Sequence, residues 1–162
     1  MKRLWAAWRM KYITNADKET GCIFCNALAK PDDAQNLVVR RGERAFIILN
    51  KYPYTSGHLM VAPLAHQASL ELLQPAERAE MMELVSECIT ALKQVYRPQG
   101  FNVGINIGTA AGAGVPGHVH IHIVPRWNGD TNFMSTVGEV RVLPEALEET
   151  YRRVKHALAT GE

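Results

Sequence analysis

The chain has 162 residues, of which 47% are hydrophobic, and this is enough for one domain with a sizeable core. Eighteen Lys and Arg against sixteen Asp and Glu give a net charge of +2, far from the strongly basic surface that binding to long nucleic acids demands. The apolar run at residues 4–8 is too short for a signal peptide, and no segment approaches the roughly 20 apolar residues that cross a bilayer. We therefore expect residues 1–162 to form a single cytoplasmic domain without nucleic-acid or membrane partners.

The N-terminal part begins with a tryptophan-containing segment. Trp5 and Trp8 are spaced to lie with Tyr12 on one side of a short helix or tail. Such residues pack onto the chain's own core or a second subunit, and the alternative is a direct contact with substrate. Residues 22–29 predict a short turn or helix that ends before Pro31.

Three runs of β-forming residues follow, at residues 37–41, 45–50 and 58–62. A turn-like Arg41-Gly42-Glu43 separates the first two, which is a hairpin signal, and the Pro and Gly of residues 51–57 indicate a loop. The pattern predicts a meander of three antiparallel strands.

The strongest helix signal begins at Pro75 and continues to Tyr96, before Pro98 and Gly100. Apolar residues recur every three or four positions, which predicts a buried face that lies across the sheet. Cys88 belongs to this stripe and is expected to be an ordinary core residue. The stripe consists of Met81, Val85, Cys88, Leu92 and Val95.

The second half predicts two more strands, at residues 101–107 and 118–124, with a glycine-rich loop at residues 108–117 between them. A closing helix begins near Pro144, and His156 is expected on its surface. This order favours an α+β fold, in which a five-stranded antiparallel sheet carries a long helix and a C-terminal helix. The inner face of the closing helix consists of Leu147, Tyr151, Val154 and Leu158.

Three histidines, His118, His120 and His122, alternate with apolar residues in the last predicted strand. Residues two apart share one face of a strand, so the imidazoles project together while the intervening residues face the core. A strand that needed only a polar outer face would use Thr, Lys or Glu, so we favour a chemical site over incidental surface histidines.

The glycine-rich loop directly before these histidines holds four glycines and almost no side-chain bulk. Such a loop lets backbone N–H groups approach an anion closely, although alone it fits a flexible connector equally well. A neutral imidazole is a capable nucleophile toward phosphorus. Loop and histidines together predict a phosphate-containing substrate.

The run His118-Val119-His120-Ile121-His122-Ile123-Val124 resembles the His-x-His-x-His-x-x signature of the histidine triad (HIT) superfamily. The resemblance covers most of the chain, because residues 50–63 look like the second motif of that family and residues 108–117 take the place of its phosphate loop. Residues 4–9 and 125–134 are similar to a bacterial branch that includes a diadenosine tetraphosphate phosphorylase. The resemblance implies a HIT-like fold and a homodimer whose sheet continues across both subunits.

Carried over by position, the resemblance makes His120 the nucleophile that takes the α-phosphate and becomes a nucleotidyl-histidine. His122 and His58 would then contact the phosphate oxygens. Asn50 corresponds to a residue that holds the ribose in relatives, and a turn-forming Asn is an equal alternative.

The loop departs from the family pattern at two positions. Many relatives carry Gln and then Ser or Thr where this chain has Gly114 and Val115. Backbone donors of the loop, including that of Gly112, must then hold the phosphate. The glycine-rich run resembles the phosphorylase-like branch rather than the hydrolases.

Cys22 and Cys25 have the spacing of zinc ligands, but they supply half of a tetrahedral site. His66 and His118 are the natural candidates for the other half, because zinc-carrying members of the superfamily use this set. A closed site with four protein ligands would be structural. The alternatives are a thioredoxin-like redox pair and two reduced thiols without metal.

The leading function is transfer or hydrolysis of a nucleotidyl group from a dinucleoside polyphosphate, with diadenosine tetraphosphate the expected substrate. Magnesium would accompany the nucleotide, and inorganic phosphate is a candidate acceptor. One alternative is a nucleoside phosphoramidase that uses the same histidines. The other is a purine nucleotide-binding module without turnover, in which the nucleophile His120 would be unneeded.

Overall fold

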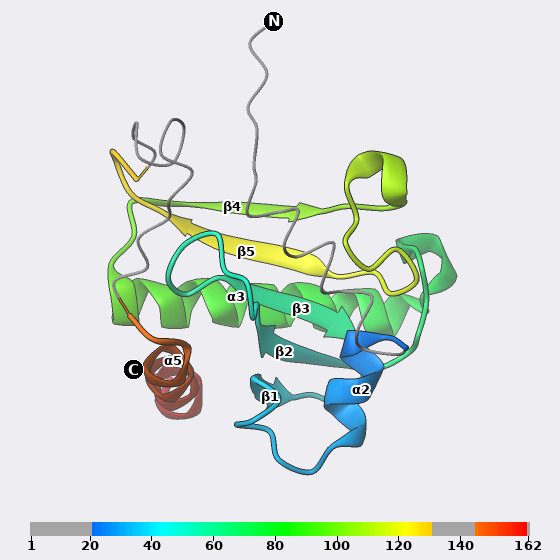
Figure 1. The fold of residues 1–162 in the computed structure, drawn as a ribbon, viewed down its shortest axis with the longest axis horizontal. Coiled ribbons are helices and arrows are strands. Elements are labelled where there is room, and N and C mark those ends of the chain that lie inside the picture. The colour runs from blue at the N-terminus through cyan, green and yellow to red at the C-terminus, as the bar shows by residue number, and fades with distance from the viewer. Residues whose placement is uncertain (1–20, 131–144, 162) are drawn as a thin grey trace, which may run out of the picture.

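The computed structural model describes residues 21–130 and 145–161, and it confirms the α+β fold with a five-stranded antiparallel sheet (Figure 1). The tryptophan-containing N-terminal segment and the expected helix start at Pro144 lie outside the described residues. The elements are α2 (Ile23–Ala29), β1 (Val38–Arg41), β2 (Ala45–Leu49), β3 (Leu59–Pro63), the 3-10 helix η1 (Leu70–Leu72), α3 (Pro75–Tyr96), β4 (Gly100–Ile105), the 3-10 helix η2 (Thr109–Ala111), β5 (Ile121–Arg126) and α5 (Leu147–Thr160).

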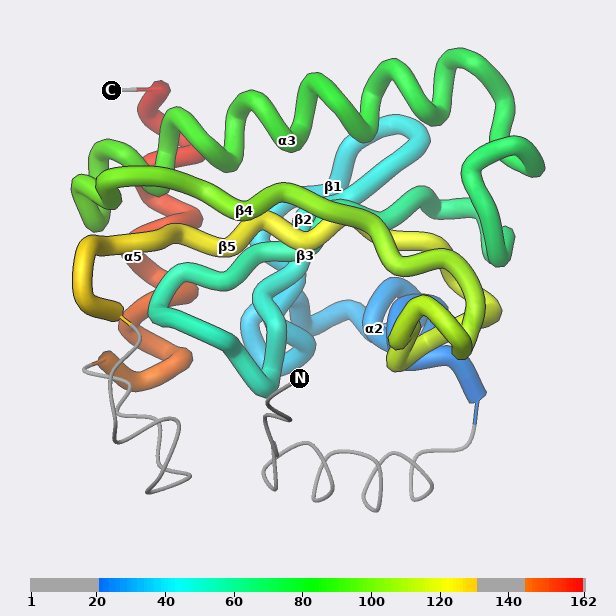
Figure 2. Tube along the Cα trace, turned by 90° about the horizontal axis from the view of Figure 1, so that it is seen from above, coloured from blue at the N-terminus to red at the C-terminus, as the bar shows by residue number. Residues whose placement is uncertain are grey.

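The strands are arranged in the order β1-β2-β3-β5-β4, and each pairs antiparallel with its neighbours. The first three form the predicted meander. The helix α3 then carries the chain across one face, so that β4 returns at the outer edge and β5 inserts between β4 and β3 (Figures 1 and 2). This order places the histidine motif of β5 beside β3, the strand that follows His58.

The histidine strand begins later than predicted. The ladder between β3 and β5 ends at the pair Val61–Ile121, so His118 and His120 precede it. The continued register would set Pro63 opposite Val119, and proline has no N–H to donate. Val119 instead donates its N–H to the carbonyl of Gln67 at 2.7 Å. The motif therefore enters the sheet through a loop that is held by specific bonds.

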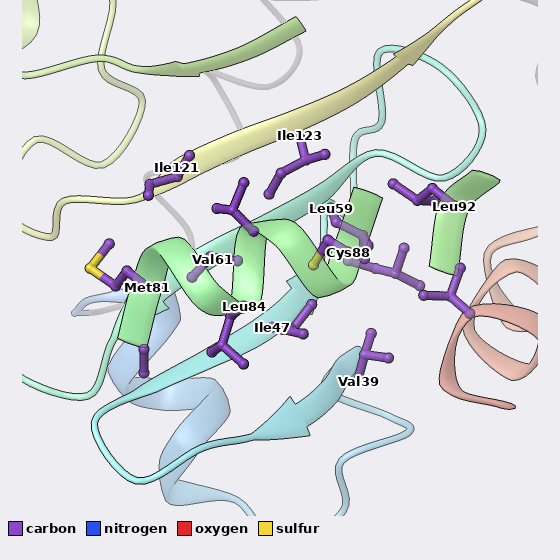
Figure 3. Packing of buried hydrophobic residues seen from close by; sticks show 14 of the residues in the cluster. Val39, Ile47, Leu59, Val61, Met81, Leu84, Cys88, Leu92, Ile121 and Ile123 are labelled. Atoms are coloured by element: carbon purple, nitrogen blue, oxygen red, sulfur yellow. The ribbon is translucent and has the colours of Figure 1, made fainter. Parts of the chain in front are cut away.

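The main core lies between α3 and one face of the sheet (Figure 3). The predicted stripe of α3 is confirmed at four positions, including Cys88, whose thiol pKa is raised by burial. Val95 is half-buried rather than part of the core, and its carbonyl accepts a hydrogen bond of 2.7 Å from Arg153 of α5. Leu84 and Ala91 complete the buried face.

The closing helix α5 covers the edge strand β1. Tyr151 and Val154 are buried on its inner face, and Leu158 packs against the core from a half-buried position. The Tyr151 hydroxyl donates a hydrogen bond of 3.0 Å to the carbonyl of Val38 in β1, which ties the helix to the sheet edge. His156 is exposed, as predicted. In the described part of the chain, no helix has both the length and the apolar character for a membrane span.

Candidate active site and metal centre

The helix α2 lies on the side of the sheet opposite α3 (Figure 2). His118 and His120 contact Phe24 of this helix, so they lie on the same side. The Phe24 ring of α2 lies 5.0 Å from the His118 ring and 4.8 Å from the His120 ring, between centroids. His120 and His122 are themselves 4.8 Å apart. The predicted common face is therefore present, but it is not solvent-exposed, because His118 and His120 are 0% and 4% exposed.

His120 has one nitrogen committed to the backbone. Its Nδ1 lies 2.8 Å from the carbonyl oxygen of His118. A carbonyl oxygen can only accept, so Nδ1 carries the proton and Nε2 keeps a free lone pair. Burial lowers the pKa of His120, which favours the neutral ring. This is the form of imidazole that can attack phosphorus.

His58 and His122 form a hydrogen-bonded pair although they are 64 positions apart in sequence. The backbone N–H of Tyr54 donates to His58 Nδ1 at 3.1 Å, so the proton of His58 resides on Nε2. That nitrogen lies 2.9 Å from His122 Nδ1, which must accept. The remaining proton of His122 is then on Nε2, and the chain of donors ends in a single N–H on His122.

The charge state of His122 follows from its surroundings. Burial is the larger cause, and the neighbouring His120 the smaller one, that lowers the pKa of His122 to about 4. At neutral pH the ring is uncharged and acts as an oriented donor. A neutral donor pair beside a neutral nucleophile requires no proton uptake before the reaction.

Tyr54 belongs to this site and was not identified from the sequence. Its ring centroid lies 4.5 Å from that of His58 and 6.0 Å from that of His122. The sequence offers a weak signal, namely an aromatic residue within a Pro- and Gly-containing loop that ends at a histidine. Loop residues that contact a rigid scaffold commonly carry functional side chains.

Asn50 lies beside the same pair. Its Nδ2 is 3.4 Å from His58 Nδ1, and its Oδ1 accepts the backbone N–H of Tyr52 at 2.9 Å. The second contact is the turn-forming role that the sequence left open. The structure thus places the Asn50 side chain beside His58, while its Oδ1 accepts the N–H that closes the turn.

The glycine-rich loop is more ordered than a flexible connector. Gly108 and Gly112 adopt positive φ angles of 80° and 84°, which favour glycine. The N–H groups of Gly112 and Ala113 donate to carbonyls within the loop, at 3.0 and 3.2 Å. The expectation that Gly112 offers its N–H to an anion is therefore not supported, because this donor is already used.

The backbone N–H groups of the next two residues in the loop, Gly114 and Val115, remain available. In the described chain no hydrogen bond occupies the N–H of Gly114 or Val115. The Val115 carbonyl accepts the N–H of His118 at 3.3 Å, and its side chain packs on the α2 side of the sheet. This part of the loop thus joins directly onto the histidine motif.

A second cluster, formed by Cys22, Cys25, His66 and His118, has the composition of a metal site, and its ligand atoms all lie within 4.8 Å of one another. His118 donates its Nε2–H to the carbonyl of Pro63 at 2.9 Å, so its Nδ1 lone pair is left for a metal. That Nδ1 lies 3.3 Å from one sulfur and 3.7 Å from the other. Around tetrahedral zinc, ligand atoms are separated by roughly 3.3–3.8 Å, so the residues fit the metal.

The redox alternative for the two cysteines is disfavoured by their environment. Burial, followed by the neighbouring Cys22 thiol, raises the pKa of Cys25. A redox-active CxxC needs a lowered thiol pKa, which supplies the reactive thiolate. A metal ligand set accounts better for two cysteines that face two histidines.

Comparison with known proteins agrees with this geometry. Residues 32–129 match the HIT domain. An AP-4-A phosphorylase from Mycobacterium tuberculosis is 41% identical over 159 residues, which covers 94% of this chain and 82% of that protein.

Solved structures give the same result. A zinc-bound histidine triad family protein from Mycobacterium smegmatis superposes with a TM-score of 0.69 at 31% identity, over 86% of this chain and 94% of that one. A hypothetical histidine triad nucleotide-binding protein from Sulfolobus tokodaii superposes with a TM-score of 0.68 at 26% identity, over 85% and 92% of the two chains. The five-stranded fold, the histidine motif and these matches together show that the chain belongs to the HIT, or histidine triad, family.

Proposed function

We propose that this protein is a nucleotidyl transferase that acts on dinucleoside polyphosphates, with diadenosine tetraphosphate as substrate and His120 as the nucleophile. The observation that carries the proposal is the bond between His120 Nδ1 and the His118 carbonyl, which leaves Nε2 unprotonated and able to attack. The AP-4-A phosphorylase that is 41% identical to this chain supports the substrate class.

In the first step His120 Nε2 attacks the α-phosphorus and forms a P–N bond. The P–O bond to the remaining phosphates breaks, and ATP departs with that electron pair. The resulting ring is cationic, and the His118 carbonyl that accepts its Nδ1–H stabilises it. In the second step an oxygen of inorganic phosphate attacks, the P–N bond breaks, and ADP and free His120 result.

His122 and His58 act as donors in this scheme rather than as acids. Their protons are held in series, and His122 Nε2–H is the one that reaches the phosphoryl oxygens. A polyphosphate departs as an anion without taking a proton. The amine that a phosphoramidase releases must be protonated, so the neutral pair favours the anhydride substrate.

Substrate contacts are proposed for the two loops beside the histidines. The Gly114 and Val115 N–H groups supply donors to phosphate, and Gly112 shapes the loop through its positive φ. Asn50 contacts the ribose, for which its position next to His58 is suited. Any magnesium would arrive with the polyphosphate, because the described residues offer a metal-ligand cluster of three or more groups only at the two cysteines.

We propose that zinc is the resident metal of the cysteine–histidine cluster, held by Cys22, Cys25, His66 and His118. The zinc-bound relative from Mycobacterium smegmatis supports this choice. Bound zinc would supply folding free energy and join α2 to the histidine motif through His118. Residues 1–162 are proposed to form one domain around this arrangement.

A homodimer is proposed through β4, the edge strand whose outer backbone groups no described strand pairs with. Val103 on this strand is 44% exposed, an apolar residue that a second copy would cover. Sedimentation velocity is expected to give the mass of two chains, and Val103→Asp to shift it toward one. Leu72→Asp, which charges a 54% exposed apolar residue in η1, should leave the dimer intact.

The proposed reaction is tested by the fate of diadenosine tetraphosphate with and without inorganic phosphate. With phosphate, ATP and ADP are expected in equal amounts, because the free donors of Gly114 and Val115 can hold a second anion near the nucleotidyl-histidine. Anion-exchange chromatography with labelled phosphate measures the label in ADP. A matched reaction with sulfate in place of phosphate controls for ionic strength.

Three other results would contradict the proposal in different ways. ATP and AMP formed at one rate with or without phosphate would make the protein a hydrolase. Faster turnover of adenosine phosphoramidate than of diadenosine tetraphosphate would favour the phosphoramidase. Tight nucleotide binding without any product would leave a binding module.

A further inference from the structure

The loop between β2 and β3 places a tyrosine against both members of the histidine pair. The ring of Tyr54 lies 4.5 Å from that of His58, and its plane is within 19° of the His122 ring, at 6.0 Å. His58 and His122 are 5.1 Å apart, so the three rings form one compact cluster. The backbone N–H of Tyr54 also donates to His58 Nδ1.

We propose that Tyr54 is a positioning residue, which holds the His58–His122 pair in the ring planes and tautomers that present His122 Nε2–H to the phosphoryl group. The inference rests on the proposed function, since it assigns Tyr54 a part in the nucleotidyl transfer. The role is indirect, because Tyr54 acts through two histidines.

The backbone N–H and the side-chain ring of Tyr54 constrain different properties of the histidine pair. The backbone donor decides which nitrogen of His58 accepts, and that decides which nitrogen of His122 keeps a proton. The side-chain ring lies against both imidazoles, 4.5 Å from His58 and 6.0 Å from His122 between centroids, and this proximity limits the planes that they adopt. A hydrogen bond of 2.9 Å between His58 and His122 needs both conditions, since it weakens steeply when the rings turn out of line.

The aromatic ring of Tyr54 contacts the rings of His58 and His122. The ring is half-buried, and neither apolar cluster of the described residues includes it. The loop path is fixed elsewhere, since Thr55 Oγ1 donates to the Pro125 carbonyl at 3.0 Å. Gly57 packs so closely on α3 that a Cβ there would lie 2.9 Å from Leu92. Removal of the Tyr54 ring should therefore leave the loop in place.

The test compares Tyr54→Ala, Tyr54→Phe and the control Met82→Ala, which removes a 55% exposed side chain of α3. For diadenosine tetraphosphate, Tyr54→Ala should lower kcat by about tenfold or more, with KM within about threefold, because donor alignment matters most in the transition state. Tyr54→Phe should keep kcat within about twofold of the parent value, because it retains the ring that contacts His58 and His122. Met82→Ala should match the parent protein.

Imidazole ¹⁵N spectra, recorded without substrate, give the second readout. The parent protein is expected to show His58 and His122 each with an unprotonated Nδ1, and Tyr54→Ala to show His122 as a mixture of tautomers. Unchanged kcat, an effect confined to KM, or an unchanged His122 spectrum in Tyr54→Ala would each overturn the inference. If the parent protein fails to turn over diadenosine tetraphosphate, the proposed function fails, while the spectra still decide the role of Tyr54.

Discussion

Replacement of His120 by Asn is expected to lower turnover of diadenosine tetraphosphate by at least about 10⁴-fold, because His120 is the proposed nucleophile that forms the P–N bond. His120 Nε2 has the free lone pair, whereas the Nδ1 of His122 accepts the proton of His58. The variant should stay folded, because an Asn amide can still donate toward the His118 carbonyl. Steady-state kinetics with product chromatography measures the loss.

The control for this experiment is His156→Asn, which changes an exposed histidine of α5 and should leave the rate unchanged. Binding of AMP or ADP by His120→Asn, followed by calorimetry, should remain within about tenfold of the parent affinity, because the attack adds little to ground-state binding. A rapid-quench reaction of the parent protein without phosphate should yield protein labelled with a nucleotidyl group. Activity of His120→Asn within tenfold of the parent would remove His120 as nucleophile.

Loss of the metal ligands is expected to have the largest effect on stability. Cys22→Ser combined with Cys25→Ser should abolish zinc binding and lower Tm by about 10 °C or more, since a structural zinc site contributes folding free energy directly. The helix α2 has seven residues, too few to be stable alone, and it depends on Phe24, Ala27 and the cluster to stay on the sheet. Plasma emission spectrometry and thermal melts measure the two effects.

Cys88→Ala supplies the matched control, because it removes a thiol from the α3 core and not from the cluster. This variant should keep about one zinc per chain although it loses some core packing. A protein purified without chelator that contains no zinc would contradict the prediction, and so would a double serine variant with an unchanged melt.

Much of the fold could be predicted because local geometry repeats along the chain. The period of 3.6 residues placed a helix from Pro75 to Tyr96, and these are the observed bounds of α3. Alternation placed His118, His120 and His122 on one face, which the ring distances confirm. Each of these inferences depends on backbone periodicity within a short segment.

The ends of the strands and the burial of the histidines could not be predicted from the sequence, because both depend on segments that are distant along the chain. The histidine strand starts at Ile121 because the continued register would set Pro63, which has no N–H, opposite Val119. No local pattern near His118 contains that information. The histidine face is buried because α2 packs Phe24 on it, from 94 positions away from His118.

The chemistry of the site also depends partly on the sequence and partly on the tertiary structure. The sequence by itself determined which residue types are available, namely three alternating histidines, a CxxC pair and a glycine-rich loop. The tertiary structure decided the proton positions, since His120 is oriented by a carbonyl, His58 by the N–H of Tyr54, and His118 by Pro63. It also decided that the N–H of Gly112 is already used within its loop. A tautomer depends on which donor or acceptor lies about 3 Å from each nitrogen, and that neighbour is set by the packing of segments distant in sequence rather than by the periodicity of one segment.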